Sequence, residues 1–191
     1  MKPVDLERPL RTDRLELIPA QAESLRADLE GRDALARALC VYIPASWPPD
    51  LYDEDAIHFF LARLSGEGAS AGWGSYYIVG HFPGEGGKVA IGVGGFKGKP
   101  DDSGTVEIGY SLLPEFQHRG FAVEAVRGWL NFAFQHGTVE RVIAHTLANL
   151  QSSIRVLDRT GFSNAGRGDE SGALPGEVVV RYEISKRQSR P

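Results

Sequence analysis

The sequence contains a single cysteine, Cys40, among its 191 residues. One cysteine excludes an intramolecular disulfide and agrees with a reducing, cytoplasmic setting. Because Cys40 follows a stretch rich in alanine and leucine, we expect a buried helical residue there rather than a nucleophilic thiol.

Long apolar runs are also missing. None approaches the roughly 18 residues that a membrane-spanning helix needs, and the first residues, Met1 to Arg8, carry no apolar core of a signal peptide. The sequence therefore predicts neither a membrane span nor a secretory leader.

A basic surplus is absent as well. The chain has 21 basic and 25 acidic residues and a net charge of −4, which argues against a general nucleic-acid binder. The five histidines show no metal-ligand spacing, so we expect no metal. The glycine-rich stretches 84–88 and 92–95 lack the residues that complete a P-loop or a dinucleotide fingerprint.

The segments that remain alternate between helical and strand patterns. A strand is expected at 14–18, and helical spacing follows in 22–29 and 34–39, with Gly31 as the break. Three prolines exclude a regular helix in 43–52, and Asp53 or Asp55 could cap the helix that comes next.

The second half predicts three strands joined by short turns, then alternating helices and strands. The strands are expected at 73–82, 88–97, 105–113, 141–146, from 162 onward and at 177–184, and the helices at 119–136 and 152–160, with Gly161 as a C-terminal cap. This order implies one mixed α/β domain over 1–191, with its core at about 11–185 and a short basic tail at 186–191.

One hexapeptide between an expected strand and an expected helix suggests a binding function. A helix start leaves backbone N–H groups unpaired, and the helix dipole adds positive charge, so such a turn suits a phosphate or pyrophosphate. Glycine lets the backbone approach the anion closely. The segment is Gln117-His118-Arg119-Gly120-Phe121-Ala122. An ordinary strand–loop–helix connection remains the alternative for these six residues.

This hexapeptide resembles the acyl-CoA loop of the GNAT superfamily of N-acetyltransferases, Gln/Arg-x-x-Gly-x-Gly/Ala. Around it, 107–125 looks like the branch that contains ribosomal-protein N-terminal alanine acetyltransferases. A second block, 149–162, is similar to that branch's Asn-x-x-x-Ser segment and its Lys-x-Gly-Phe ending, with Arg159 in place of Lys. Thr12 to Leu17 resembles the branch's first strand.

The resemblance implies the GNAT fold: a mostly antiparallel sheet, splayed between 105–113 and 141–146, with helices on both faces. It also implies acetyl-CoA as co-substrate, with the pantetheine arm lying between the splayed strands. The residues expected to bind this co-substrate are Leu112, Leu113, Gln117, His118, Arg119, Gly120, Phe121, Ala122, Asn149 and Arg155.

Two residues are candidates for the chemistry. Glu107, on the strand leading to the loop, is the candidate general base for the acceptor amine; a solvated or ion-paired strand glutamate is the alternative. Ser153 would lie near the sulfur and donate to the leaving thiolate; a helix cap, with Ser152 as rival, is its alternative. Tyr110 is expected to line the core.

The acceptor is expected to be a small-molecule amine or a peptide N-terminus. The segment 43–52 with Trp73, Tyr76 and Tyr77 is the candidate acceptor wall, although these aromatic residues could equally be core. A non-catalytic acyl-CoA-binding module is the alternative function. The sequence leaves a homodimer open.

Overall fold

The computed structural model describes residues 8–65, 72–82, 87–169 and 176–187. Most of the expected linkers at 66–72 and 83–87 lie outside these ranges, as do residues 1–7. The described residues form one eight-stranded sheet in the order β1-β2-β3-β4-β5-β6-β8-β7. Every neighbouring pair is antiparallel except β5 and β6, which are parallel.

The strands and helices follow the sequence patterns closely. The strands are β1 (Leu10–Arg11), β2 (Leu15–Pro19), β3 (Ser75–Phe82), β4 (Gly87–Phe96), β5 (Thr105–Leu112), β6 (Arg141–Leu147), β7 (Ser163–Arg167) and β8 (Val179–Ser185). The helices are α1 (Ala22–Glu30), α2 (Arg32–Leu39), α3 (Glu54–Ser65), the short 3₁₀ helix η1 (Pro114–Phe116), α4 (Phe121–Gln135) and α5 (Gln151–Arg159). The predicted mixed α/β fold with antiparallel hairpins is confirmed.

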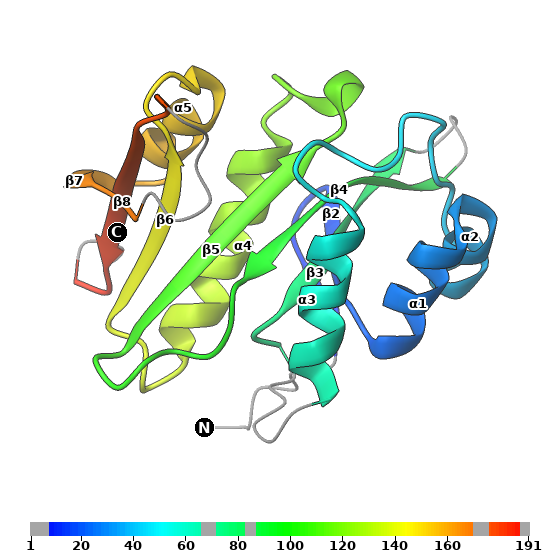
Figure 1. The fold of residues 1–191 in the computed structure, drawn as a ribbon, viewed down its shortest axis with the longest axis horizontal. Helices are drawn as coiled ribbons and strands as arrows, with labels where there is room; N and C mark the ends of the chain where they lie inside the picture. The colour runs from blue at the N-terminus through cyan, green and yellow to red at the C-terminus, as the bar shows by residue number, and fades with distance from the viewer. Residues whose placement is uncertain (1–7, 66–71, 83–86, 170–175, 188–191) are drawn as a thin grey trace.

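Helices cover both faces of the sheet, as Figure 1 shows. Helices α1, α2 and α3 pack over β2, β3 and β4, and α4 lies behind the sheet with α5 beside it. Two apolar clusters result, one on each face, with Trp129 of α4 fully buried in one and Leu25 and Leu35 in the other. The near face of β5, β6 and β8 carries no helix in Figure 1.

Several helix ends confirm their expected signals. Gly31 separates α1 from α2 with a φ of 117°. The Asp53 carboxylate accepts a hydrogen bond from the Ala56 N–H at 2.9 Å, so Asp53 caps α3. After α5, the Gly161 N–H donates to the Asp158 carbonyl and the Phe162 N–H donates to the Leu157 carbonyl, which is a Schellman ending.

One expectation about a single residue was wrong. Cys40 is exposed, because α2 ends at Leu39 and Cys40 turns the chain in a left-handed conformation with a φ of 54°. The expected tail at 186–191 stays a prediction; its first residue, Lys186, donates its N–H to the Glu140 carbonyl at 3.0 Å.

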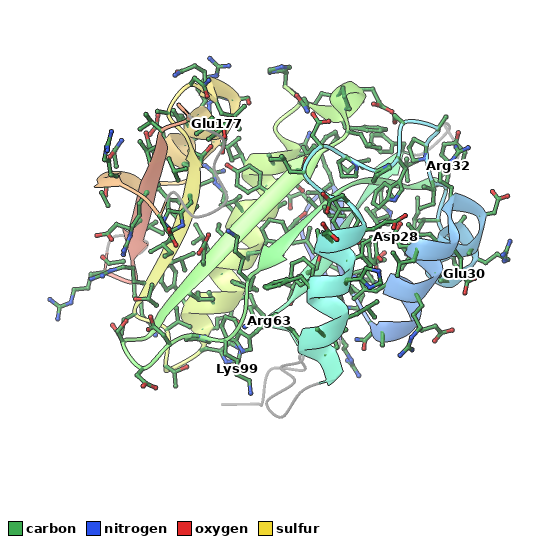
Figure 2. The ribbon with its side chains drawn as sticks, in the orientation of Figure 1. Asp28, Glu30, Arg32, Arg63, Lys99 and Glu177 are labelled. Carbon is green, nitrogen blue, oxygen red and sulfur yellow. The ribbon has the colours of Figure 1, made fainter. Side chains whose placement is uncertain are left out.

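The proline-rich segment 43–52 has no regular helix, as expected, and is held by hydrogen bonds to a half-buried carboxylate. Asp28, between α1 and α3 in Figure 2, accepts hydrogen bonds from Trp47 Nε1 at 2.9 Å and from the Tyr52 hydroxyl at 2.9 Å. The Tyr77 hydroxyl donates to it at 3.1 Å. Burial raises the pKa of Asp28 above its ordinary value, although the three donors oppose this.

The glycines of β4 have a packing role. A Cβ at Gly94 would overlap Cη2 of Trp129 and lie 2.8 Å from the Gly109 carbonyl oxygen. The bare backbone of β4 at Gly94 therefore lets α4 and β5 approach closely.

We predict that Gly94→Ala lowers the free energy of unfolding by about 1–3 kcal/mol, because the added methyl overpacks the core against Trp129. Urea denaturation measures this loss. Gly74→Ala is the matched control, since nothing lies within 4 Å of a Cβ there; equal stability of the two variants would contradict the packing role.

Candidate active site

Pairing between β5 and β6 stops partway along both strands. The parallel ladder runs from Thr105 opposite Arg141 to Ile108 opposite Ala144 and no further. Strand β5 continues beside β4 to Leu112, and β6 continues beside β8 to Leu147. The strands therefore diverge beyond these pairs, as Figure 1 shows, and the predicted splay is confirmed.

The hydrogen-bonding parity of β5 identifies which backbone groups face the splay. The Glu107 carbonyl accepts from the Lys97 N–H, and the Leu113 N–H donates to Ile91, each at 2.9 Å on the β4 side. Even-numbered residues therefore direct their backbone groups toward β6, so those of Tyr110 and Leu112 face the diverging strand. The Leu113 carbonyl accepts from the Phe116 N–H, and the role expected of Leu113 stays a prediction.

The loop after β5 presents a row of backbone donors. Within the described part of the chain, the N–H groups of residues 118–123 have no acceptor. His118 and Gly120 adopt left-handed conformations, with φ of 58° and 82°, and Gly120 is the N-cap of the 15-residue α4. The Gln117 amide donates to the Leu112 carbonyl at 2.9 Å and ties the loop to β5. This geometry is that of an anion site at a helix start.

The side chains of the loop differ in their exposure to solvent. His118 and Arg119 are exposed, whereas the Phe121 ring is buried, so Phe121 can offer a ligand only its backbone. The Arg119 guanidinium lies over three rings, 5.3 Å from Phe121, 5.5 Å from Phe82 and 5.9 Å from Phe116. These contacts hold a positive charge beside the loop.

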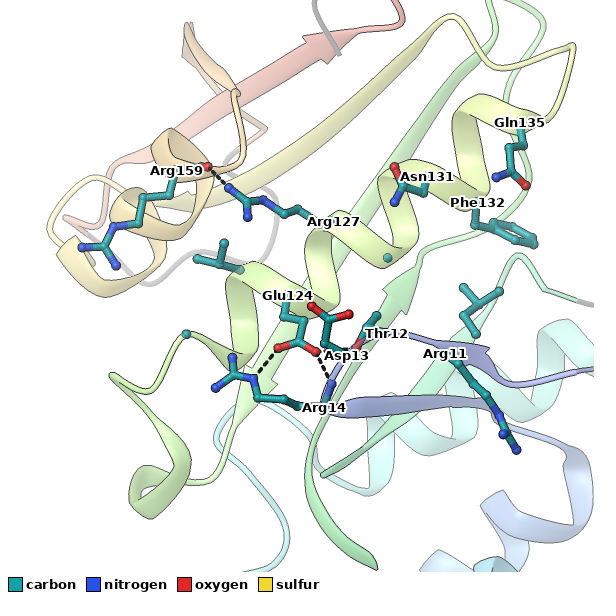
Figure 3. A pocket seen from close by; sticks show the side chains of 14 residues that line it. Arg11, Thr12, Asp13, Arg14, Glu124, Arg127, Asn131, Phe132, Gln135 and Arg159 are labelled. Carbon is teal, nitrogen blue, oxygen red and sulfur yellow. Dashed lines mark hydrogen bonds and ion pairs between the residues drawn. The ribbon is translucent and has the colours of Figure 1, made fainter. Parts of the chain in front are cut away.

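An ion pair from the N-terminal strands supports this loop, and no sequence pattern indicated it. The Glu124 carboxylate accepts from Thr12 Oγ1 at 2.5 Å and from the Arg14 N–H and Nε, each at 2.7 Å (Figure 3). Arg14 also donates to the Arg119 carbonyl at 3.2 Å and lies 4.5 Å from the Phe121 ring. Arg14 therefore fixes the backbone that carries the free N–H groups.

Glu107 lies in a charged cluster at the base of the splay. Its Oε1 accepts from Lys97 Nζ at 2.5 Å and lies 3.0 Å from His145 Nδ1. The structure thus gives Glu107 the ion pair that was the alternative to a free base, and it adds His145, which sequence reasoning had left without a role.

Ser153 faces the splay from α5. Its Oγ and its carbonyl each lie 3.2 Å from the Tyr110 hydroxyl. The cap interpretation of Ser152 and Ser153 was wrong, because α5 starts at Gln151 with Leu150 as an N-cap that makes no side-chain bond. Tyr110 packs against the core as expected. Burial raises its pKa to about 12, so the phenol keeps its proton at neutral pH.

The remaining candidates lie around the splay. Asn149 and Arg155 are exposed, Asn149 in the turn after β6 and Arg155 on α5. Thr146, near the end of β6, is buried, and its Oγ1 has no hydrogen-bond partner among the described residues. An orphaned hydroxyl beside unpaired strand edges suits a ligand that carries amide groups.

The aromatic acceptor wall was a wrong expectation. Trp73 and Tyr76 are buried in the cluster on the α4 side, and Tyr77 is buried with Trp47 in the cluster on the other face. All four side chains are core. In the segment 43–52 it is Leu51 that is most exposed among the large apolar residues.

A hollow of about 830 Å³ runs along α4 behind the sheet (Figure 3). It touches the loop at Gly120 and Val123 and continues past Arg127 to Gln135. None of its lining residues belongs to β5 or β6, so it adjoins the loop at Gly120 without reaching the splay.

Neither a metal site nor a membrane span is found in the part of the chain that the structure describes. No three histidine, cysteine or acidic side chains are grouped there so as to hold an ion. None of the described helices combines the length and the apolar character needed to cross a bilayer.

We predict that Glu124→Gln lowers stability at pH 7 by about 1–2 kcal/mol, the usual contribution of a charge-assisted hydrogen bond. Burial alone would raise the pKa of Glu124, but hydrogen bonds from Thr12 and Arg14 outweigh it and lower this pKa. The contribution is therefore present above the ordinary glutamate pKa of about 4.3 and is lost as pH falls through the lower folded-state value.

Urea denaturation at pH 7 and below pH 4 measures this difference, which should shrink in acid. The matched control is Glu30→Gln on the exposed end of α1, which should equal the wild type at both values. An undiminished difference in acid would contradict the assigned role of the carboxylate.

Comparison with known proteins places this geometry in a family. Residues 14–163 match the family model of the acetyltransferase (GNAT) domain. The chain is 29% identical over 153 residues to a Bacillus subtilis (strain 168) protein described as uncharacterized N-acetyltransferase YjdG, covering 80% of this chain and 88% of that protein.

Solved structures share the fold. The ribosomal L7/L12 alpha-N-protein acetyltransferase RimL, in complex with coenzyme A, has a TM-score of 0.65 at 17% identity, covering 93% of this chain and 98% of that one. A GNAT-family acetyltransferase described as putative, from Bordetella pertussis, has a TM-score of 0.65 at 21% identity, with coverages of 93% and 99%. The Microcin C7 self-immunity acetyltransferase MccE, in complex with acetyl-CoA and AMP, has a TM-score of 0.60 at 18% identity, with coverages of 91% and 93%.

The family match spans the diverging strands β5 and β6, the loop with the free N–H groups of residues 118–123, and α5. These are the parts that form the site described above. The chain belongs to the GNAT acetyltransferase family and is an N-acetyltransferase of that family.

Proposed function

We propose that the protein transfers the acetyl group of acetyl-CoA directly to a primary amine, either a small molecule or a peptide N-terminus. The observation that carries this proposal is the row of unpaired N–H groups at 118–123, next to the point where β5 and β6 part. The row of N–H groups suits a pyrophosphate, and the gap between the two strands suits an extended arm that carries amides.

Acetyl-CoA would be held mainly by backbone groups. The N–H groups of residues 118–123 and the positive end of α4 would surround the pyrophosphate, while the Gln117 side-chain amide holds the loop to β5. Asn149 and Arg155 contribute polar contacts at the mouth of the splay. The Tyr110 backbone and Thr146 Oγ1 are placed to pair with the amides of the arm, because neither has a partner on that side within the described residues.

Acetyl-CoA supplies an activated acetyl group, and the chain's residues supply charge stabilisation and proton transfer. The Leu112 N–H is placed to donate to the carbonyl oxygen as negative charge develops, an interaction that typically contributes about 3 kcal/mol. The amine nitrogen bonds to the carbonyl carbon, and the carbon–sulfur bond breaks. A proton of the amine nitrogen passes to the basic cluster around Glu107.

The leaving sulfur needs a donor, and the pair of Tyr110 and Ser153 meets this need. The phenol is protonated at neutral pH, as a tyrosine is at its ordinary pKa of about 10, and burial raises this pKa to about 12. The Ser153 hydroxyl, 3.2 Å from the phenol, can pass a hydrogen bond onward to the sulfur. The two groups together can protect the thiolate from reattack.

The proposed function is tested by following free thiol released from acetyl-CoA over a panel of amino acids, polyamines, aminoglycosides and N-terminal peptides, alongside calorimetry with coenzyme A. We expect heat of binding and turnover of at least one amine. Binding without any turnover would favour the acyl-CoA-binding module instead, and no binding would contradict both functions.

We predict that Gly120→Val weakens coenzyme A binding by roughly 10- to 100-fold. A β-branched residue disfavours the left-handed backbone, with its φ of 82°, that aims the loop N–H groups. Calorimetry gives the affinity. Gly137→Val is the control, because a Cβ there meets nothing within 4 Å and its φ is not positive. An unchanged affinity in Gly120→Val would contradict the proposed binding of the pyrophosphate by this loop.

We predict that Ser153→Ala lowers kcat about 10-fold and leaves coenzyme A affinity within about twofold, because the hydroxyl acts on the leaving sulfur in the transition state. Steady-state kinetics and calorimetry separate the two effects. The neighbouring Ser152 is exposed and has no assigned contact, so Ser152→Ala should behave as wild type. Equal kcat in both variants would show that Ser153 does not assist departure.

A further inference from the structure

A row of charged side chains crosses the helix-free face of the sheet at the base of the splay. Alternation along paired strands places its members on one face. From β4 toward β8 they are Lys97, just beyond β4, then Glu107, His145, Arg181 and Glu183. The proposed transfer needs a basic group at this place, and the row contains one imidazole.

His145 occupies the first position of β6 beyond the last pair with β5. Its side chain is 19% exposed, so it is enclosed but still open to an incoming group. Glu107 lies on the neighbouring strand opposite Ile143, one pair before the last pair of the ladder. Its Oε1 is 3.0 Å from His145 Nδ1. His145 is therefore nearer to the point of divergence than Glu107 is.

The carboxylate of Glu107 is occupied by two donors. Lys97 Nζ lies 2.5 Å from the same oxygen that faces His145 Nδ1. A carboxylate acting as the hydrogen-bond acceptor for Nδ1 sets the imidazole tautomer, because the proton then resides on Nδ1 and the lone pair on Nε2. Within the described residues no hydrogen bond is made by His145 Nε2.

The backbone after β7 fixes the ring. A Cβ at Gly168 would lie 2.5 Å from His145 Cδ2 and 3.3 Å from Nε2, so only glycine lets the chain pass this edge of the imidazole. Gly168 is itself held by its N–H bond to the Val179 carbonyl at 2.9 Å. The ring is thus oriented from two sides, by Glu107 at Nδ1 and by Gly168 at Cδ2.

We propose that His145 is the catalytic base of the acetyl transfer and that Glu107 is the positioning residue that orients it. This inference rests on the proposed function. Nε2 takes one proton from the acceptor ammonium, and the freed amine nitrogen bonds to the acetyl carbon. The carbon–sulfur bond then breaks, and the second proton of the nitrogen passes to the leaving sulfur, which departs as a thiol. The imidazolium, stabilised by Glu107, then releases its proton to water.

Several charged groups surround the ring and bear on its pH dependence. Glu107 faces it from β5 and Lys97 from the end of β4. Arg181 is its direct partner on β8 and bonds to Glu183, which also lies 3.9 Å from Arg141. Arg167 and Asp169 flank Gly168 on the segment after β7.

The test is His145→Gln, assayed with acetyl-CoA and the amine that the wild type acetylates fastest in the panel. We expect a fall in kcat/KM of roughly 100- to 1,000-fold, which is within the usual contribution of a general base. The rise of kcat/KM with pH that the wild type shows should disappear, and coenzyme A affinity should stay within about twofold. The control is His58→Gln, on the exposed side of α3, which should match the wild type.

Glu107→Gln tests the positioning role. In the wild type, nitrogen NMR of the assigned His145 ring should show the proton on Nδ1 when the ring is neutral. In Glu107→Gln this tautomer preference should be lost and kcat should fall, while a rise of rate with pH remains. Because the wild-type spectrum needs no variant, it tests the proposal even if His145→Gln does not fold.

The outcomes separate the two proposals. A wild type that acetylates no amine contradicts the proposed function itself. Turnover by the wild type with unchanged rate and pH profile in His145→Gln overturns the role of His145 alone. A neutral ring protonated on Nε2 overturns it as well, and loss of the pH-dependent rise in Glu107→Gln only would make Glu107 the base.

Discussion

The end of pairing between β5 and β6 is the constraint on which the site depends. Beyond Ile108 and Ala144 each strand keeps its other neighbour, so the sheet remains intact while two inner edges lose their partners. Unpaired backbone groups away from water are costly, and a ligand that supplies amides can satisfy them. The charged row, the Tyr110–Ser153 pair and the loop all lie around this divergence.

The loop is held by contacts that are distant in sequence. Arg14 and Glu124 are separated by 110 positions, yet they join the first strands to the first turn of α4 and fix the carbonyl of Arg119. On the other side, Gly94 of β4 lets Trp129 of α4 pack closely against the sheet. The free N–H groups are therefore aimed by the packing of the whole sheet rather than by the hexapeptide alone.

Local patterns were enough to predict the elements and the loop. Periodicity located the helices and strands within a few residues, and Gly31, Asp53 and Gly161 marked ends because their effects are local. The exposure of side chains was harder to predict. Cys40 follows an apolar stretch, but a left-handed turn places it at the surface. Trp73, Tyr76 and Tyr77 proved to be core. Arg14 and His145 could not be assigned, since their partners lie across the sheet and no local pattern reveals such contacts.

The central claim is that the diverging edge of β5 and the start of α4 bind one ligand together. Titration of labelled protein with coenzyme A, followed through backbone amide resonances, tests it most directly. We expect large shifts at Leu112, Gly120 and Ala122 and little change at Ile91 and Val93 in β4. Shifts confined to the hollow behind α4, around Asn131 and Gln135, or no shifts at all, would contradict it.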